Sequence, residues 1–163
     1  MTFRVFLVMA LLALAACAPP PAGTDGDEIY WIRDRDAANV QFRMLDAVNA
    51  LRGAAGAGPV QLNPELTAAA ATHSRDMALQ NRPWHFGSDG SSPLDRVVRV
   101  GYPGPLVGET ISETFETELE TLAAWMDRED TRQVILDPTA QNLGFSWFQE
   151  ETGKLWWTMV LGG

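Results

Sequence analysis

The chain has 163 residues and a formal net charge of -9, with 12 basic residues outnumbered by 21 acidic ones. This balance argues against nucleic acid as a partner and against electrostatic adsorption to anionic lipid, because both need clustered Lys and Arg. The only cysteine, Cys17, leaves no internal disulfide, so we expect one domain held together by its hydrophobic core.

Residues 1–16 have the pattern of a bacterial signal peptide. Arg4 precedes an apolar block at 5–16, whose 12 residues fall short of the roughly 20 that a transmembrane helix needs. The sequence Leu-Ala-Ala-Cys at 14–17 resembles the lipobox, in which the cysteine is acylated before cleavage. Ordinary cleavage that leaves a free Cys17 thiol is the alternative. Loss of 1–16 removes a single charged residue, Arg4, and leaves a net charge of -10.

The segment 17–35 is expected to be a lipidated cysteine followed by a spacer, because 18–28 is rich in Pro, Gly and Asp and cannot form a core. Tyr30, Trp31 and Ile32 interrupt this composition, and we expect them to dock on the domain that follows at 36–163. Ala18 favours the outer membrane, because an aspartate after the cysteine is typical of inner-membrane lipoproteins. Stable anchoring needs two or more acyl chains.

The first half of the domain reads as helical. A spacing of three and four residues predicts one helix over 36–52 and, after an Asn63 cap and Pro64, a second over 64–80. His73 falls on the apolar face of the second helix, so we interpret it as a buried core residue. The loop 81–91 contains Trp84, the tryptophan that we expect to be most exposed, and a short helix over 93–100 follows the cap residue Ser92.

The second half mixes helices and strands. An extended segment at 107–111 precedes a helix with Phe115, Leu119, Leu122 and Met126 inward and with Glu116, Glu118 and Glu120 on an acidic outer face. A shorter helix ends before Asp137, and alternating apolar residues at 143–147 and 155–161 predict a terminal hairpin. The fold class is therefore α+β, with a small antiparallel sheet covered by helices.

Short segments that are individually weak occur in the order found in one family. They lie at 48–52, 59–66, 69–78, 84–93, 95–96, 101–102, 108–109, 125–126, 135–138 and 143–144. From about residue 40 to 163 the sequence thus resembles the CAP superfamily, which is named for cysteine-rich secretory proteins, antigen 5 and the pathogenesis-related class. The resemblance implies an α-β-α sandwich.

In that family a cleft is lined by two histidines and acidic residues, and some members bind a divalent metal there. The resemblance implies that His85 is the first histidine and that Glu109 is the glutamate after a glycine. Thr131 stands where the second histidine is found, Arg128 replaces a helix glutamate, and Glu129 is one place off. We therefore expect a binding cleft formed by His85, Glu109, Thr131 and Trp84.

Three functions follow from this cleft. We favour a monomeric, membrane-tethered binding module for a small apolar ligand or an envelope polymer, without enzymatic activity. The alternative is a metal-assisted hydrolase of envelope material, with zinc held by His85 and Glu109, or with His85 as the base and Ser88, Ser91 or water as the nucleophile. The third is a structural lipoprotein whose cleft is inactive.

Overall fold

A computed structural model describes residues 29–113 and 117–163. The expected signal peptide, Cys17 and most of the spacer lie outside the described residues, as do Phe115 and Glu116. In chain order the elements are a 3-10 turn η1 (Asp34–Asp36), α1 (Ala37–Ala54), β1 (Gln61–Leu62), α2 (Pro64–Gln80), α3 (Pro93–Arg99), β2 (Leu106–Glu113), α4 (Glu118–Asp127), α5 (Glu129–Leu136), β3 (Asn142–Gln149) and β4 (Leu155–Gly162).

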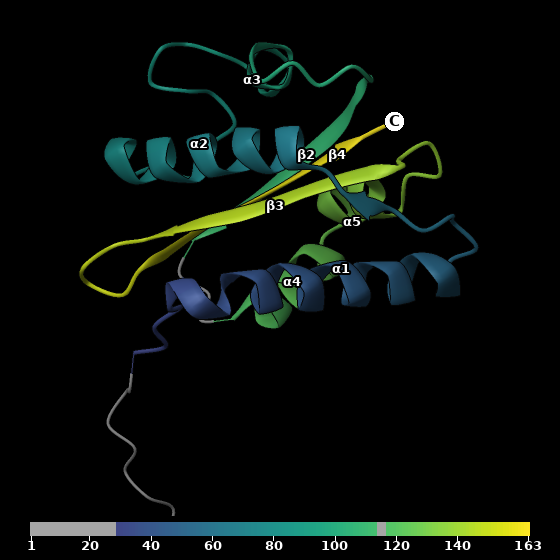
Figure 1. Ribbon diagram of the computed structural model, residues 1–163, viewed down its shortest axis with the longest axis horizontal. Coiled ribbons are helices and arrows are strands. Elements are labelled where there is room, and N and C mark those ends of the chain that lie inside the picture. Colours follow the sequence, from purple (N-terminus) through teal and green to yellow (C-terminus); the bar gives the residue numbers. More distant parts are fainter. Residues whose placement is uncertain (1–28, 114–116) are drawn as a thin grey trace, which may run out of the picture.

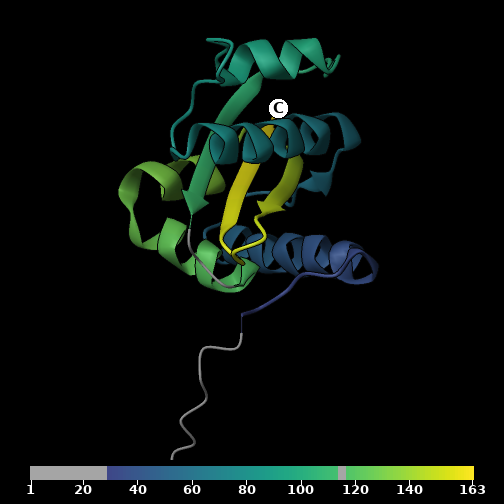
Figure 2. The ribbon, with the colours of Figure 1, turned by 90° about the vertical axis from the view of Figure 1, so that its left-hand side faces the viewer.

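The elements form three layers around one sheet with the strand order β1-β3-β4-β2. Helices α2 and α3 lie on one side of the sheet, whereas α1 and α4 lie on the other, with α5 beside β2 (Figures 1 and 2). This arrangement confirms the α-β-α sandwich. The sheet is mixed rather than purely antiparallel, because β1 pairs in parallel with β3, from Gln61 opposite Asn142. A strand of two residues is too short for an alternating pattern to reveal it.

Strand β4 is the centre of the core, and all eight of its residues are buried. On one side Trp157 stacks on Phe145 with ring centroids 5.5 Å apart, within the cluster that includes Met44 of α1. On the other side Val160 packs with Leu66 and with other residues of α2 and α3. Both faces of the strand are therefore covered, as predicted for a strand with apolar residues on both sides.

The ends of α2 and α3 are set by the predicted caps. The side chain of Asn63 accepts a hydrogen bond from the Leu66 amide at 2.8 Å, and Pro64 occupies the first helical position. Ser92 and Asp95 form a reciprocal capping box at the start of α3. These local bonds satisfy amides that the helices leave free, which explains why the sequence located both starts.

The acidic face predicted for α4 is wrong at Glu118. This side chain is buried and pairs with Arg43 of α1, at 2.5 Å between Oε1 and Nε, whereas Leu119 is 47% exposed. Leu122 is buried as predicted, and the other buried positions are Thr121 and Trp125 of the helix that begins after the Thr117 cap. The sequence pattern places the helix one position out of phase at its start.

The expected docking of residues 30–32 is confirmed for Tyr30 and Ile32 and is wrong for the Trp31 side chain. The side chain of Gln149 donates to the Tyr30 carbonyl at 2.7 Å and accepts from the Ile32 amide at 3.0 Å. Tyr30 and Ile32 pack against the core, while Ile29 and Trp31 are exposed. Across 29–113 and 117–163, the structure contains no helix that is both long and apolar enough to cross a membrane.

Candidate functional site

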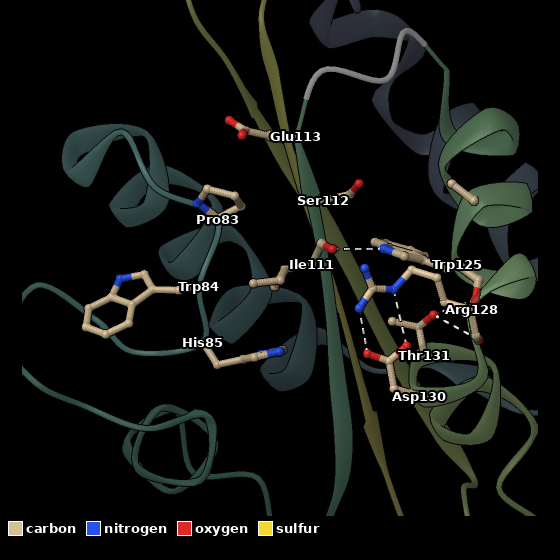
Figure 3. A pocket seen from close by; sticks show the side chains of 11 residues that line it. Pro83, Trp84, His85, Ile111, Ser112, Glu113, Trp125, Arg128, Asp130 and Thr131 are labelled. Carbon is tan, nitrogen blue, oxygen red and sulfur yellow. Dashed lines mark hydrogen bonds and ion pairs between the residues drawn. The ribbon is translucent and has the colours of Figure 1, made fainter.

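A pocket of about 440 Å³ lies between the loop after α2, the end of β2 and the junction of α4 with α5 (Figure 3). Its floor and walls are partly apolar and partly polar. The lining residues are Pro83, Trp84, His85, Ile111, Ser112, Glu113, Ala124, Trp125, Arg128, Asp130 and Thr131. The indole of Trp125 is fixed by a hydrogen bond of 3.0 Å to the Ile111 carbonyl, which joins α4 to β2 beneath the pocket.

His85 is held by a buried carboxylate. Its Nδ1 lies 2.9 Å from Oε1 of Glu109, and the imidazole is 50% exposed while the Glu109 side chain is 2% exposed. Because a carboxylate accepts hydrogen bonds, we assign the proton of neutral His85 to Nδ1. The ring points toward Thr131 and Asp130 (Figure 3), so Nε2 is the nitrogen available to a ligand. Glu109 contacts His85 on the Nδ1 side and is not one of the residues that line the pocket.

The charge of Glu109 is matched by Arg96 of α3. One guanidinium nitrogen, Nη2, lies 2.9 and 2.8 Å from the two carboxylate oxygens and also donates to the His85 carbonyl at 3.0 Å. Arg96 is 3% exposed, so the pair is shielded from water. The same arginine therefore fixes both the side chain that orients His85 and the backbone of His85, which keeps the imidazole in one position.

His73 lies next to Glu109 and Trp84. Its interpretation as a buried residue is confirmed because it is 0% exposed. Its Nε2 lies 2.9 Å from the Trp84 carbonyl and 3.6 Å from Glu109, which assigns the proton to Nε2. Burial lowers the pKa of His73, against an opposite effect of Glu109, so the ring is neutral near pH 7. His73 is thus a packing and hydrogen-bonding residue.

The loop that carries His85 is fixed at both ends. Asp76 of α2 accepts hydrogen bonds from the amide and hydroxyl of Ser88 at 2.7 and 2.5 Å. The Gly87 amide donates to the Ser91 carbonyl at 2.8 Å, and a Cβ at Gly87 would lie only 2.6 Å from the Ser91 hydroxyl. A side chain at this position would therefore displace the Ser91 hydroxyl, which shows how closely the turn between α2 and α3 is packed.

The wall opposite His85 contains the residue that replaces the family's second histidine. Thr131 lines the pocket, and its hydroxyl donates to the Trp125 carbonyl. Arg128 and Asp130 form an exposed ion pair at 2.7 Å on the same wall (Figure 3). Glu129 is not among the lining residues and accepts a bond from Gln133 instead. The structure thus brings His85 and Thr131 to one pocket and leaves Glu129 outside it.

Trp84 contacts the pocket but is not the exposed ring that the sequence predicted. It is half-buried, its indole donates to Gln80 at 2.7 Å, and the Arg82 guanidinium lies 3.9 Å from its ring centroid. Figure 3 shows the ring directed away from Trp125 and Thr131. These contacts with the end of α2 and with the loop direct the ring away from the pocket.

The two candidate serine nucleophiles are engaged elsewhere. Ser88 donates to Asp76, and hydrogen bonds from Ser91 are the main cause that lowers the pKa of Asp89 to about 2. Neither serine lines the pocket that contains His85. Ser112 does line it, but its hydroxyl points away from His85 in Figure 3. The arrangement resembles a histidine base oriented by a carboxylate, without a side-chain nucleophile beside it.

A zinc ion held by His85 and Glu109 would share the Glu109 carboxylate with Arg96. Both oxygens of Glu109 are bonded by Arg96, and a cation would have to compete with that buried guanidinium. Nowhere in 29–113 or 117–163 do three or more His, Cys, Asp or Glu residues gather as a metal-binding group. Zinc binding stays a prediction, and no chemical step is assigned to a metal here.

Arg96 and the β2 residues at 111–113 are the parts of the site that sequence reasoning missed. In the sequence Arg96 is only half of an Asp-Arg pair, and nothing in a single sequence shows that an arginine three places after a proline faces a glutamate on another strand. The predicted extended segment ended at Ile111, and only the sheet order places β2, which continues to Glu113, at an edge beside the loop at 83–85.

This chain is similar to known proteins in sequence and in fold. The sequence matches the cysteine-rich secretory protein family, CAP, over residues 45–161, and the chain therefore belongs to the CAP family. It is 29% identical over 120 residues to the protein YkwD of Bacillus subtilis strain 168, an alignment that covers 74% of this chain. The same alignment covers 46% of YkwD, so the chain spans about half the length of that relative.

Two solved structures share the fold at low sequence identity. An outer surface protein of Borrelia burgdorferi has a TM-score of 0.70 at 12% identity, over 76% of this chain and 92% of its own. An extracellular protein with an SCP domain from Bacillus anthracis strain Ames has a TM-score of 0.69 at 21% identity, over 77% of this chain and 41% of its own. At these identities the likeness extends to the fold alone.

Proposed function

We propose that this CAP-family protein is a lipid-tethered module on the periplasmic side of the outer membrane, where its pocket binds a small, largely apolar ligand or part of an envelope polymer. The observation that carries the binding role is the fixed imidazole of His85 at the rim of a pocket floored by Trp125 and Ile111. The tether follows from the lipobox-like sequence that ends at Cys17.

The lining favours a ligand with an apolar body and one polar group. Ile111 and Pro83 offer apolar surface above the buried ring of Trp125, while Nε2 of His85 can form a hydrogen bond with a polar group of the ligand. Binding is favoured over catalysis because the residues beside His85 supply no nucleophile, and because Thr131 cannot replace the second histidine as an acid or a metal ligand.

Native mass spectrometry of protein purified from its own envelope tests the binding role. We expect a co-purified mass beyond the acyl chains, and we expect Ala124→Trp to remove it, because this half-buried residue of α4 lines the pocket. Ala123→Trp is the matched control, since Ala123 is the exposed neighbour on the same helix and does not line the pocket. A mass retained equally in both variants would place the ligand elsewhere, and no added mass in the wild type would contradict the proposal.

The hydrolase alternative has its own test. Equilibrium dialysis with zinc would compare the wild type with His85→Ala and Glu109→Ala. Binding by the wild type that both substitutions abolish would support a metal-assisted reaction, and absence of binding by the wild type would exclude that version. If the cleft is inactive, as in a purely structural lipoprotein, the double substitution would leave the cellular phenotype unchanged.

A further inference from the structure

Two exposed apolar side chains, Ile29 and Trp31, lie where the described residues begin. Along the extended segment 29–32 the side chains alternate, so that Tyr30 and Ile32 enter the core while Ile29 and Trp31 are 46% and 49% exposed. Gln149 donates one hydrogen bond to this segment and accepts another from it, and Ile29 lies against Gly153 in the β3–β4 turn. The outward direction of Ile29 and Trp31 is therefore fixed by the fold.

The length of chain between this pair and the expected anchor limits where the pair can be. Twelve residue steps separate Cys17 from Ile29, which at about 3.3–3.6 Å per residue span at most about 43 Å whatever course they take. An acylated Cys17 would thus keep Ile29, and the hairpin turn beside it, within that distance of the bilayer. A tryptophan with an exposed apolar ring and a polar N–H is suited to the headgroup region of a membrane.

Charge provides no attraction for such a contact. The residues that follow the pair, at 33–36, are two of each sign, but Asp27 and Glu28 precede it and Glu150 and Glu151 belong to the turn that Ile29 contacts. Contact with lipid would therefore depend on burial of apolar surface rather than on attraction to anionic headgroups.

We infer that Ile29 and Trp31 insert into the surface of the bilayer that holds Cys17, and so set the orientation of the domain on the membrane. This inference rests on the tether in the proposed function. It also bears on the pocket, because Lys154 in the hairpin forms an ion pair of 2.5 Å with Glu113, which lines the pocket. The pocket therefore lies toward the end of the domain that faces the membrane, where an apolar ligand could enter from lipid.

Nuclear magnetic resonance on the acylated full chain in phosphatidylcholine nanodiscs tests this contact. A spin label on the lipid headgroup should broaden the Trp31 indole and Ile29 methyl signals several-fold more than the methyl signals of Leu94 and Val98. These two side chains are the control because they are more exposed than the pair, at 54% and 67%, but belong to α3 on the opposite side of the sheet (Figures 1 and 2). Equal broadening at both places, or stronger broadening at α3, would overturn the inference.

A matched pair of variants tests whether Trp31 holds the orientation. With Trp31→Ser we expect broadening of the Gly153 amide, which lies beside Ile29, to fall at least twofold. Val98→Ser should leave it unchanged, and an equal effect of the two substitutions would count against a role for Trp31. The mass of the purified chain separates the two proposals: an acylated Cys17 without contact at Trp31 defeats only the membrane orientation, whereas an unacylated Cys17 defeats the tether as well.

Discussion

Single side chains in this protein act through a buried charge pair. His85 is the group that a ligand can reach, but its position depends on Glu109, and Glu109 depends on Arg96. A charge taken out of water is costly unless it is paired. Arg96 therefore stabilises the Glu109 carboxylate, and Glu109 in turn holds His85. The His85 imidazole is consequently preorganised before any ligand arrives, and its orientation should be more sensitive to Glu109 and Arg96 than to residues on the pocket rim.

Glu109→Gln should therefore destabilise the fold as well as release His85. The amide keeps the shape of the side chain but leaves the Arg96 guanidinium buried without a counter-charge, and we expect a loss of about 3 kcal/mol in the free energy of unfolding, measured with urea. Asp130→Asn is the control, because its pair with Arg128 is exposed and should contribute nothing measurable. Equal effects of the two substitutions would contradict the buried pair.

His73→Ala should lower the free energy of unfolding by about 1–3 kcal/mol near pH 7.5, because a buried ring with a hydrogen bond is lost. The effect should depend on pH. Burial lowers the pKa of folded His73, so below its ordinary value of 6.5 the unfolded chain binds the proton more readily, and the wild type loses stability as the pH falls. The gap between wild type and variant should thus narrow from pH 7.5 to 5, and a constant or widening gap would refute this assignment.

At the scale of helices and strands, close backbone contacts hold the layers together. Gly144 of β3 faces the start of α2, where a Cβ would lie 2.1 Å from the Leu66 carbonyl carbon. A second joint is Arg52, which is fully buried at the end of α1 and donates to the carbonyls of Gly58, Ile135, Asp137 and Ala140. Through these contacts the helices have fixed places on the sheet, and the pocket between them has a fixed shape.

Gly144→Ala should destabilise the protein by about 1–3 kcal/mol, because the added methyl group meets backbone atoms that cannot rotate away. The same substitution at Gly53 of α1 provides the comparison. There a Cβ meets nothing within 4 Å, and alanine in a helix should stabilise slightly. Thermal denaturation of the two variants measures the contrast, and a neutral Gly144→Ala would show that α2 does not pack so closely.

The elements that could be predicted from the sequence are those whose signals are local. Asn63 and Ser92 begin helices through bonds to nearby amides, and the apolar period of α1 continues for several turns, so these boundaries were predicted closely. The phase of α4 and the parallel pairing of β1 depend on distant partners, Arg43 and β3, and no local pattern reports them. In the site, the motif located His85 and Glu109, whereas Arg96 and the edge position of β2 required the fold.

At the scale of the whole molecule, the pocket and the docked segment 29–32 lie toward the same end of the sandwich. The chain enters the domain beside the β3–β4 turn, and the pocket residue Glu113 is tied to the same turn through Lys154. A lipid anchor upstream of Ile29 would therefore place the pocket near the membrane. Since the chain without residues 1–16 carries a net charge of -10, the proposed attachment would depend on acyl chains and apolar contact rather than on basic residues.

The location, the tether and the orientation all depend on one chemical modification, so the most direct test is the mass of the N-terminal peptide of protein extracted from its own membranes. The account predicts a peptide that begins at Cys17 and carries a diacylglyceryl group on its sulfur. Cys17→Ser should abolish both the added mass and recovery in the membrane fraction. A wild-type peptide that retains Met1, or that contains Cys17 as a free thiol, would contradict the account.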